Sequence, residues 1–345
     1  MGRSASPRPK RDLAGIRENV TGGFCPGVHL CGMIGNVDVL SDILDVLQLR
    51  GTLYFRTAFS PPWSVAVPAY GRAARFHLAV QGRCHVRVGD DRDVTLNPGD
   101  MIVIPNGSAH TLSDRPDRAP AALDDVLRQS GFTGEGALAF GGEPQADADT
   151  KLICGHFNFA ENADHPLLRT LPPHLLVTAE LRAQAPWLDE LMRLITRQMF
   201  AEAPGFSASV VRLSEALFIE VIRTCADQDP ALAGMIEAMG DPRIGRAMAL
   251  MHRSLEKDWT LDRIAREVGM SRSRFADRFQ ALIGSAPMSY LSDLRLQKAM
   301  TLLADTGDPV QSVATRVGYQ SPAAFSRAFA NRYGHSPREA RRSAG

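Results

Sequence analysis

Two groups of polar and small side chains near the C-terminus have the chemistry to read the edges of DNA bases. Each group lies near the start of an expected helix, on the face opposite two phenylalanines. Arginine pairs bidentately with guanine, and a small residue such as alanine fits against the methyl group of thymine. We therefore predict base contacts by Arg272, Ser273, Ala276 and Asp277 in the first group and by Gln320, Pro322, Ala323, Ser326 and Arg327 in the second.

Three more arginines on the same expected helices suit the phosphate backbone. Phosphate contacts position a protein on DNA without reading its sequence, and Arg274, Arg278 and Arg332 could supply them, with a solvated surface position as the alternative for each. Residues 241–345 hold 17 Lys and Arg against 10 Asp and Glu, whereas the rest of the chain holds 22 against 28. A polyanionic partner is therefore expected for the C-terminal segment alone.

The elements that must position these side chains form a repeated helix-turn-helix pattern. Gly269 and Gly318 are 49 positions apart, and after one inserted residue Ser271 and Ser321 are 50 apart. A spacing that recurs in this way indicates an internal repeat. In each unit we expect the glycine to end the first helix and the serine to cap the second. The predicted core positions are Leu261, Ile264, Ala265, Val268, Phe275, Phe279 and Ile283 in the first unit and Val310, Val313, Ala314, Val317, Phe325, Phe329 and Tyr333 in the second.

The segment between the units predicts one long helix, residues 287–305, which begins at Pro287. Proline is favoured at the first position of a helix because its missing N–H would be unpaired there in any case. A rigid spacer suits two recognition helices that lie about 34 Å apart, the length of one duplex turn.

The second unit, VATRVGYQSPAAFSRAFANRYGHSPREAR over 313–341, carries a family resemblance. Its VGY, its FSR-x-F and its GxSP-x-x-R spacing make residues 241–342 resemble the DNA-binding domain of AraC/XylS-type transcription regulators. The resemblance implies a bipartite helix-turn-helix domain of seven helices. It also implies binding to double-stranded promoter DNA, usually as an activator that acts on RNA polymerase.

The N-terminal half reads as short strands separated by Gly, Pro and Asp. Alternating apolar segments at 52–59, 63–68, 75–82, 84–89, 93–96, 100–105 and 151–159 predict a β-barrel or sandwich. Residues 115–150 are interpreted as a loop with one helical turn at 124–129.

Gly99 to His110 has the form G-x5-P-x-G-x2-H, which resembles the second motif of the cupin superfamily. The first cupin motif would require G-x5-H-x-H and a later Glu. Gly71 to His77 supplies its first part, but Ala79 stands at the second His, and Arg83 or Cys84 stands where the Glu would be. Because a metal centre needs three protein ligands, no cofactor is predicted. A metal ion at His77 and His110, completed by His156 or Cys84, is the weaker alternative.

Residues 37–342 as a whole are similar to AraC-type regulators that have a cupin-like sensor domain. The resemblance rests on PPW at 61–63, ICGHFNF at 153–159 and HPLLRTLPPHLL at 165–176. It implies a small-molecule effector, for which the pocket candidates are His77, Cys84, His110, Cys154 and His156. Some relatives sense oxidants through cysteine, and Cys154 stands at the matching position, although no partner thiol is evident. An inert buried thiol is the alternative.

We expect four segments along the chain. Residues 1–36 form a disordered tail, in which the C-x3-H-x-C pattern of Cys25, His29 and Cys31 resembles half of a zinc site without a second half. Residues 37–172 form the cupin-like domain, which begins with a helix at 37–49. Residues 173–239 form a helical linker with helices at 186–200 and 207–225, which either pack within the chain or form a homodimer interface. Residues 241–345 form the DNA-binding domain.

The predicted fold class is α+β, and the predicted function is a non-enzymatic, sequence-specific transcription regulator controlled by a small-molecule or redox signal. No apolar run approaches the roughly 18 residues that a membrane helix needs. The five cysteines are odd in number and scattered, which favours a reducing compartment. We therefore expect a cytoplasmic protein with no membrane partner. The alternatives are a cupin-type metal enzyme with an appended DNA-binding domain and a non-specific architectural DNA binder.

Overall fold

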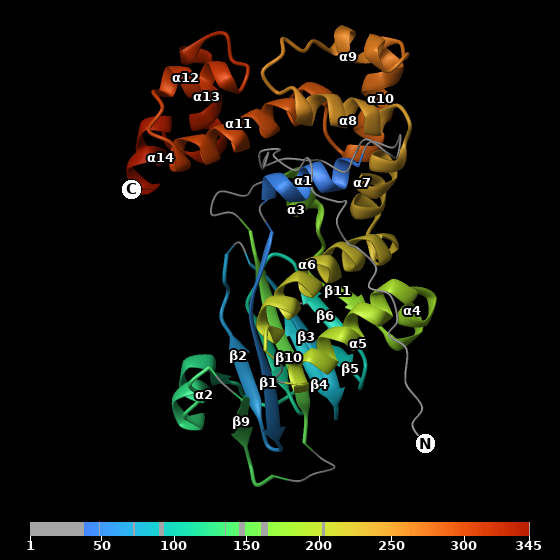
Figure 1. The fold of residues 1–345 in the computed structure, drawn as a ribbon, viewed down its shortest axis with the longest axis vertical. Coiled ribbons are helices and arrows are strands. Elements are labelled where there is room, and N and C mark those ends of the chain that lie inside the picture. The colour runs from blue at the N-terminus through green and yellow to red at the C-terminus, as the bar shows by residue number, and fades with distance from the viewer. Residues whose placement is uncertain are drawn as a thin grey trace, which may run out of the picture. The chain divides into compact units, whose positions relative to one another are not determined.

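The computed structural model describes residues 38–47, 49–71, 73–89, 93–134, 136–144, 149–159, 165–201 and 204–344 (Figure 1). The expected tail at 1–36, with Cys25, His29 and Cys31, lies outside the described residues. The chain divides into a unit of residues 1–37 and a unit that starts at Asp38. Everything below concerns the second unit, in which no described helix is long and apolar enough to cross a membrane.

Two sheets form the N-terminal half of the described chain. One has six strands in the order β11-β6-β3-β10-β1-β9, and the other has five in the order β5-β4-β7-β2-β8. The first sheet comprises β1 (Arg50–Ser60), β3 (Ala73–Gln81), β6 (Met101–Ile104), β9 (Ala137–Gly141), β10 (Lys151–Asn158) and β11 (Leu175–Val177). The second comprises β2 (Ser64–Val67), β4 (Cys84–Val88), β5 (Val94–Leu96), β7 (His110–Ser113) and β8 (Ala121–Ala122).

The core between the sheets follows from the alternation of side chains along each strand. Ala79 on β3, Leu152 on β10 and Ile102 on β6 contribute from the first sheet, and Val65 and Val86 contribute from the second. All of these side chains are buried. The predicted mixed fold with a cupin-like strand region is therefore confirmed, in the form of two facing sheets.

Residues 115–150 contain more structure than the expected loop. The helical turn predicted at 124–129 is part of α2 (Leu123–Ser130), which begins with Asp124 and Asp125 in its first turn and ends at Gly131 in the left-handed conformation. The segment also holds β8 and β9, which the sequence reading did not predict. Both strands pair with parallel partners that are distant in the chain, β2 and β1, so local alternation gave no signal.

Helices accompany the first sheet (Figure 1). They are α1 (Val39–Leu47), α3 (Pro166–Thr170), α4 (Ala179–Gln184), α5 (Pro186–Ala201), α6 (Phe206–Thr224), the short 3-10 helix η2 (Ala226–Gln228) and α7 (Pro230–Gly240). The predicted helices at 37–49, 186–200 and 207–225 correspond to α1, α5 and α6. Gly205, with φ 81°, precedes α6 at the predicted break.

Helix α6 packs against the sheet within the chain. The Phe218 ring lies 5.0 Å from the ring of Phe157 on β10 and 5.6 Å from that of Phe159. This is the intramolecular packing that the sequence left open beside dimerisation. Homodimer formation remains a prediction, and Trp187 at the start of α5, which is 78% exposed, is the large apolar side chain available for it.

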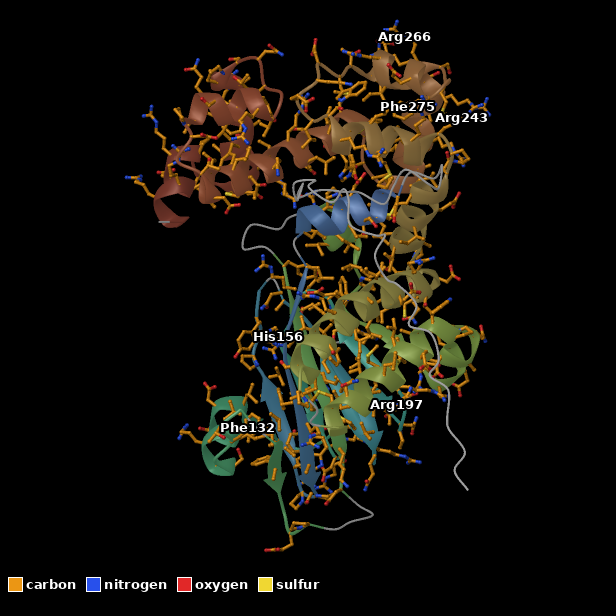
Figure 2. All side chains as sticks on the ribbon, viewed as in Figure 1. Phe132, His156, Arg197, Arg243, Arg266 and Phe275 are labelled. Atoms are coloured by element: carbon orange, nitrogen blue, oxygen red, sulfur yellow. The ribbon has the colours of Figure 1, made fainter. Side chains whose placement is uncertain are left out.

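Seven helices make up the described residues 244–344. They are α8 (Ile244–Arg253), α9 (Leu261–Glu267), α10 (Arg272–Ile283), α11 (Pro287–Asp305), α12 (Val310–Arg316), α13 (Pro322–Tyr333) and α14 (Pro337–Ala344). The pairs α9–α10 and α12–α13 are the two predicted helix-turn-helix units, and α11 is the predicted helix between them. Arg243 and Arg266 are exposed in this region, whereas Phe275 is fully buried (Figure 2).

Candidate functional site

The turn of each helix-turn-helix unit depends on a glycine. Gly269 has φ 65° and Gly318 has φ 89°, values that side chains other than glycine rarely adopt. The following serines differ. Ser321 accepts a hydrogen bond from the Ala324 N–H at 3.3 Å and caps α13. Ser271 occupies the N-cap position of α10 but makes no capping hydrogen bond through its side chain, so that part of the prediction is wrong.

The inner face of each second helix is aromatic and fully enclosed. Phe275, Phe279, Phe325 and Phe329 have no exposed surface. The ring pairs Phe275–Phe279 and Phe325–Phe329 are 5.7 Å and 5.6 Å apart, within the range that favours aromatic contacts. This burial fixes the rotation of α10 and α13 about their axes and therefore decides which residues face outward.

The predicted base-reading residues all lie outside that buried face. Ala276 and Ser326 are half-buried, and the other seven are exposed. Arg272 reaches Asp262 at 3.4 Å, across the turn from α9. Arg327 makes no hydrogen bond or ion pair with any described residue. The two units therefore present equivalent outward faces with charged side chains near the start of each helix.

The three predicted phosphate contacts separate into two kinds. Arg274 is exposed. Arg278 donates to Asp241 through Nε at 2.9 Å and Nη2 at 2.5 Å, and Arg332 lies 3.7 Å from Asp293. Because a carboxylate already opposes the charge of Arg278 and of Arg332, Arg274 is the better phosphate contact of the three.

Helix α11 holds both units. Tyr290, near its start, packs against Phe279 of α10 with ring centres 5.5 Å apart. Leu296, Met300 and Leu303, further along, belong to one buried cluster with Phe325 and Phe329 of α13. Its Arg295 also donates to the Leu255 and Lys257 carbonyls, at 2.9 and 2.7 Å, and so ties down the segment that precedes α9.

Three of the five predicted effector-pocket residues meet in one buried chain of hydrogen bonds. His110 Nδ1 lies 2.9 Å from the Ser108 carbonyl oxygen, which can only accept. His110 Nε2 lies 2.8 Å from His77 Nε2, and His77 Nδ1 lies 3.1 Å from Cys154 Sγ. The cross-strand pairing of His77 on β3 with Cys154 on β10 places these two side chains on the same face.

The direction of this chain follows if both rings are neutral. Burial lowers the pKa of His110 to about 4 and holds the pKa of His77 well below its usual value, with His110 and Arg75 adding to the effect on His77. We therefore assign His110 Nδ1–H as the donor to Ser108, His77 Nε2–H as the donor to His110, and the Cys154 S–H as the donor to His77. Burial also raises the pKa of Cys154.

The remaining pocket candidates differ in exposure. His156 on β10 is half-buried (Figure 2), and burial followed by the charge of Arg75 lowers its pKa. Cys84 on β4 is fully buried in the core between the sheets, and burial raises its pKa to about 12. The sequence reading missed Arg75. Its signal is weak but present, because Arg75 precedes His77 by two positions in a predicted strand.

A cupin metal centre does not fit these residues. His77 and His110 hydrogen-bond directly to each other, and the second nitrogen of each ring faces Cys154 or Ser108. Ala79 takes the place of a third ligand. Among the described residues no group of three or more His, Cys, Asp or Glu is arranged to hold a metal ion.

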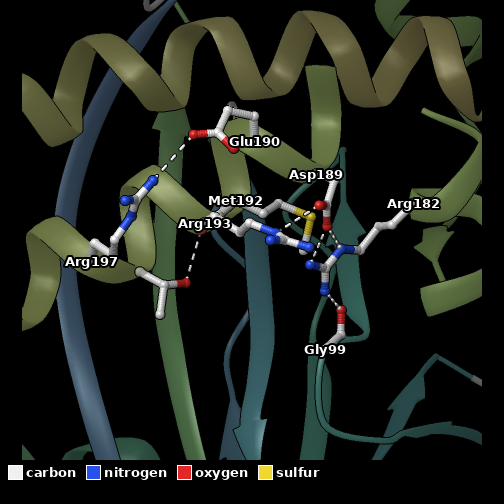
Figure 3. Close-up of polar contacts among 8 residues, drawn as sticks. Gly99, Arg182, Asp189, Glu190, Met192, Arg193 and Arg197 are labelled. Atoms are coloured by element: carbon white, nitrogen blue, oxygen red, sulfur yellow. Dashed lines mark hydrogen bonds and ion pairs between the residues drawn. The ribbon is translucent and has the colours of Figure 1, made fainter. Parts of the chain in front are cut away.

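A surface cavity of about 510 Å³ lies between α5 and the first sheet, away from these histidines. Figure 3 shows its arginines engaged by neighbouring groups. Arg182 donates to the Gly99 carbonyl at 2.6 Å, Arg182 and Arg193 share Asp189, and Arg197 lies 3.1 Å from Glu190. Since these charges are already balanced, the cavity reads as an ion-pair network that fastens α4 and α5.

Comparison with known proteins covers both halves of the chain. A cupin family model matches residues 38–227, and a helix-turn-helix domain model matches residues 264–343. The HTH-type transcriptional regulator AlkR of Acinetobacter baylyi is 29% identical over 308 residues, covering 88% of this chain and 99% of AlkR. An AraC-like transcription regulator of Streptomyces antibioticus is 29% identical over 308 residues, covering 89% of this chain and 99% of that protein.

Solved structures match the C-terminal region. The AraC-type transcriptional regulator from Chromobacterium violaceum is 30% identical, covers 31% of this chain and 96% of the solved chain, and has a TM-score of 0.30.

Proposed function

Because the chain belongs to the AraC/XylS-type transcription regulators that carry an N-terminal cupin domain, we propose that α10 and α13 bind consecutive major grooves of promoter DNA. Arg272, Ser273, Ala276 and Asp277 contact bases from α10. Gln320, Pro322, Ala323, Ser326 and Arg327 contact bases from α13. Arg274 contacts phosphate.

One observation carries this assignment. Two helices at matching positions of an internal repeat bury their phenylalanines and expose their polar faces, while α11 packs against both. A recognition helix needs such a free face, since its first turns approach the base edges. The absence of any partner for Arg327 among the described residues leaves its guanidinium available for guanine.

The sensor half supplies the signal in this proposal. A small molecule bound between the sheets shifts the balance of two arrangements in proportion to its preference for one of them. We infer that the chain activates transcription together with RNA polymerase, in the cytoplasm and as a homodimer. Cys154 carries a redox signal only if its thiol becomes reactive, which its burial opposes.

A metal enzyme is not favoured. His77 and His110 use their facing nitrogens for each other, so the proposal assigns no catalytic residue.

Selection of bound duplexes from a random library tests the DNA-binding proposal. We expect one enriched sequence with two short conserved parts, and an affinity that falls steeply as salt rises. Arg327→Ala should lower the preference for the enriched sequence over random DNA about tenfold or more, the worth of one bidentate base contact. Arg128→Ala, which removes an exposed charge on α2, is the matched control. Enrichment of no sequence, or equal effects of both variants, would refute the assignment.

A further inference from the structure

Arg75 occupies an inward-facing position on β3. Alternate residues of a strand face the same side of the sheet, so Arg75 shares its face with the buried His77 and Ala79. Its direct cross-strand neighbours are His156 on β10 and Ile104 on β6. Ile104 belongs to the core between the sheets. Arg75 therefore lies one step along this inner row from the His77 hydrogen-bond chain.

The charge of Arg75 is not balanced by the protein. Its side chain is half-buried, and no carboxylate of the described residues forms an ion pair with it. The Nε atom is fully enclosed and has no hydrogen-bond partner. The guanidinium carbon lies 4.0 Å from the ring centre of Tyr70, an aromatic side chain that is 44% exposed. A buried polar group without a partner needs an explanation in a native fold.

Other partly buried arginines of this half are treated differently. Arg118 donates to Asp114 at 2.6 and 3.0 Å, and Arg182 has both Asp189 and the Gly99 carbonyl. Arg75 alone of these three reaches inward without a carboxylate. Structural arginines in this fold therefore have carboxylate partners, whereas Arg75 has a vacant position for one.

We propose that Arg75 binds the carboxylate of a small organic acid, with His156 and Tyr70 beside it. This inference rests on the sensor role proposed above and gives the chemical class of its ligand. A guanidinium presents two parallel N–H groups that match the two oxygens of a carboxylate. Arg75 is a single positive charge, so it complements a monoanion better than a phosphate dianion, which calls for further cations or backbone N–H groups.

The neighbouring histidines support this division of roles. Both ring nitrogens of His77 and of His110 are already hydrogen-bonded, so neither ring can bind a ligand without breaking the chain. His156 makes no hydrogen bond to the described residues and is half-buried. Arg75 and His156 are therefore the polar groups free to contact a ligand. The field of Arg75 reaches all four candidates His77, His110, Cys154 and His156, since it acts on each of their pKa values.

The first test needs no ligand. An unbalanced cation withdrawn from water destabilises the fold, so replacing Arg75 by the apolar, similarly long side chain in Arg75→Met should raise the Tm of the full-length protein by a few degrees. Arg83→Met, which removes an exposed charge from the adjoining turn, is the control and should leave the Tm unchanged. A lower Tm for Arg75→Met would show that Arg75 holds the fold together, and would overturn the proposal.

The second test uses acetate, hexanoate and benzoate as probes, with hexanamide and benzamide as uncharged analogues at equal ionic strength. At least one carboxylate should raise the Tm of the native protein saturably, and its amide should not. The shift should be lost in Arg75→Met and reduced in Arg75→Lys, which keeps the charge but loses the planar fork. If no carboxylate shifts the Tm, or if the shift survives in Arg75→Met, the ligand class is wrong.

The two proposals fail separately. DNA selection with the same Arg75→Met protein should still enrich the native sequence, because Arg75 lies in the strand region and α10 and α13 do not. Retained DNA recognition without any carboxylate effect removes only this inference. Loss of sequence preference in the native protein removes the proposed function itself.

Discussion

The Cys154 thiol lies 3.1 Å from Nδ1 of His77, and His77 in turn hydrogen-bonds to His110. A histidine beside a cysteine often activates the thiol, but here burial raises the pKa of Cys154 and holds that of His77 low. The pair is therefore a neutral hydrogen bond between thiol and imidazole. It orients the His77 ring and does not create a nucleophile.

This relationship predicts slow chemistry at the buried thiols. In a Cys25→Ser, Cys31→Ser protein, iodoacetamide should leave Cys84, Cys154 and Cys225 unmodified until denaturant is added, because each is buried and has a raised pKa. Peptide mass mapping before and after unfolding measures this. Rapid modification of Cys154 in the folded protein would reveal an activated thiolate and restore the redox signal as the leading hypothesis.

The two turn glycines should differ in their tolerance of alanine. Both have positive φ, but a Cβ at Gly269 would meet nothing within 4 Å, whereas one at Gly318 would lie 2.5 Å from the Leu255 carbonyl oxygen. We expect Gly269→Ala to lower the free energy of unfolding by about 1 kcal/mol, the cost of a left-handed alanine. Gly318→Ala should cost roughly 3 kcal/mol or more, because backbone must also move. Urea denaturation compares them, and equal losses would contradict the described contact.

The arginine pairings predict unequal contributions to the salt dependence of DNA binding. Arg274→Ala should lower the slope of log affinity against log salt by about one, as for the loss of one phosphate contact. Arg332→Ala should change the slope little, because Asp293 already opposes that charge and only 27% of the Arg332 side chain is exposed. Fluorescence anisotropy over a salt series measures both. A larger change for Arg332→Ala would show that its ion pair opens on DNA.

Acid should destabilise the fold through His252, whose Nε2 lies 2.9 Å from the Tyr290 hydroxyl. Burial lowers the pKa of His252 to about 4, below the ordinary value of about 6.5. Between these values the unfolded chain binds more protons, so stability is complete above about pH 6.5 and is lost as the pH falls toward 4. The loss from this residue is on the order of 3 kcal/mol.

His252→Gln, which retains a hydrogen-bonding side chain, should flatten this pH dependence when the free energy of unfolding is measured from pH 7 to 4. His335→Gln, at an exposed position, is the control and should keep the native slope. An unchanged slope in His252→Gln would assign the acid sensitivity to other groups, of which the buried His165 is the first candidate.

The sequence could predict elements whose signal is local. Alternation found the long strands β1, β3 and β10, and the repeat located α9, α10, α12 and α13 to within a few residues. It could not find β8 or β9, which exist because distant strands offer their edges. Ser271 likewise has the residue type of a cap without the hydrogen bond, because side-chain orientation is decided by its surroundings.

The same division holds for the candidate site. Residue type and family motif pointed to His77, His110 and Cys154, and pairing of β3 with β10 brings His77 and Cys154 together. The link to His110 needs the second sheet, which the sequence does not place. Arg75 stayed hidden because an arginine in a strand looks like an edge residue until the register shows that it faces inward.

Helix α11 packs against both helix-turn-helix units through one rigid stretch of backbone. In a DNA target, each extra base pair between two half-sites turns one of them by roughly 35° about the duplex axis. A reader with a stiff connection cannot follow that rotation, whereas one with a flexible tether could. The gap between the two recognised words is therefore itself part of the message, and bases that the protein never contacts should still tolerate no insertion or deletion.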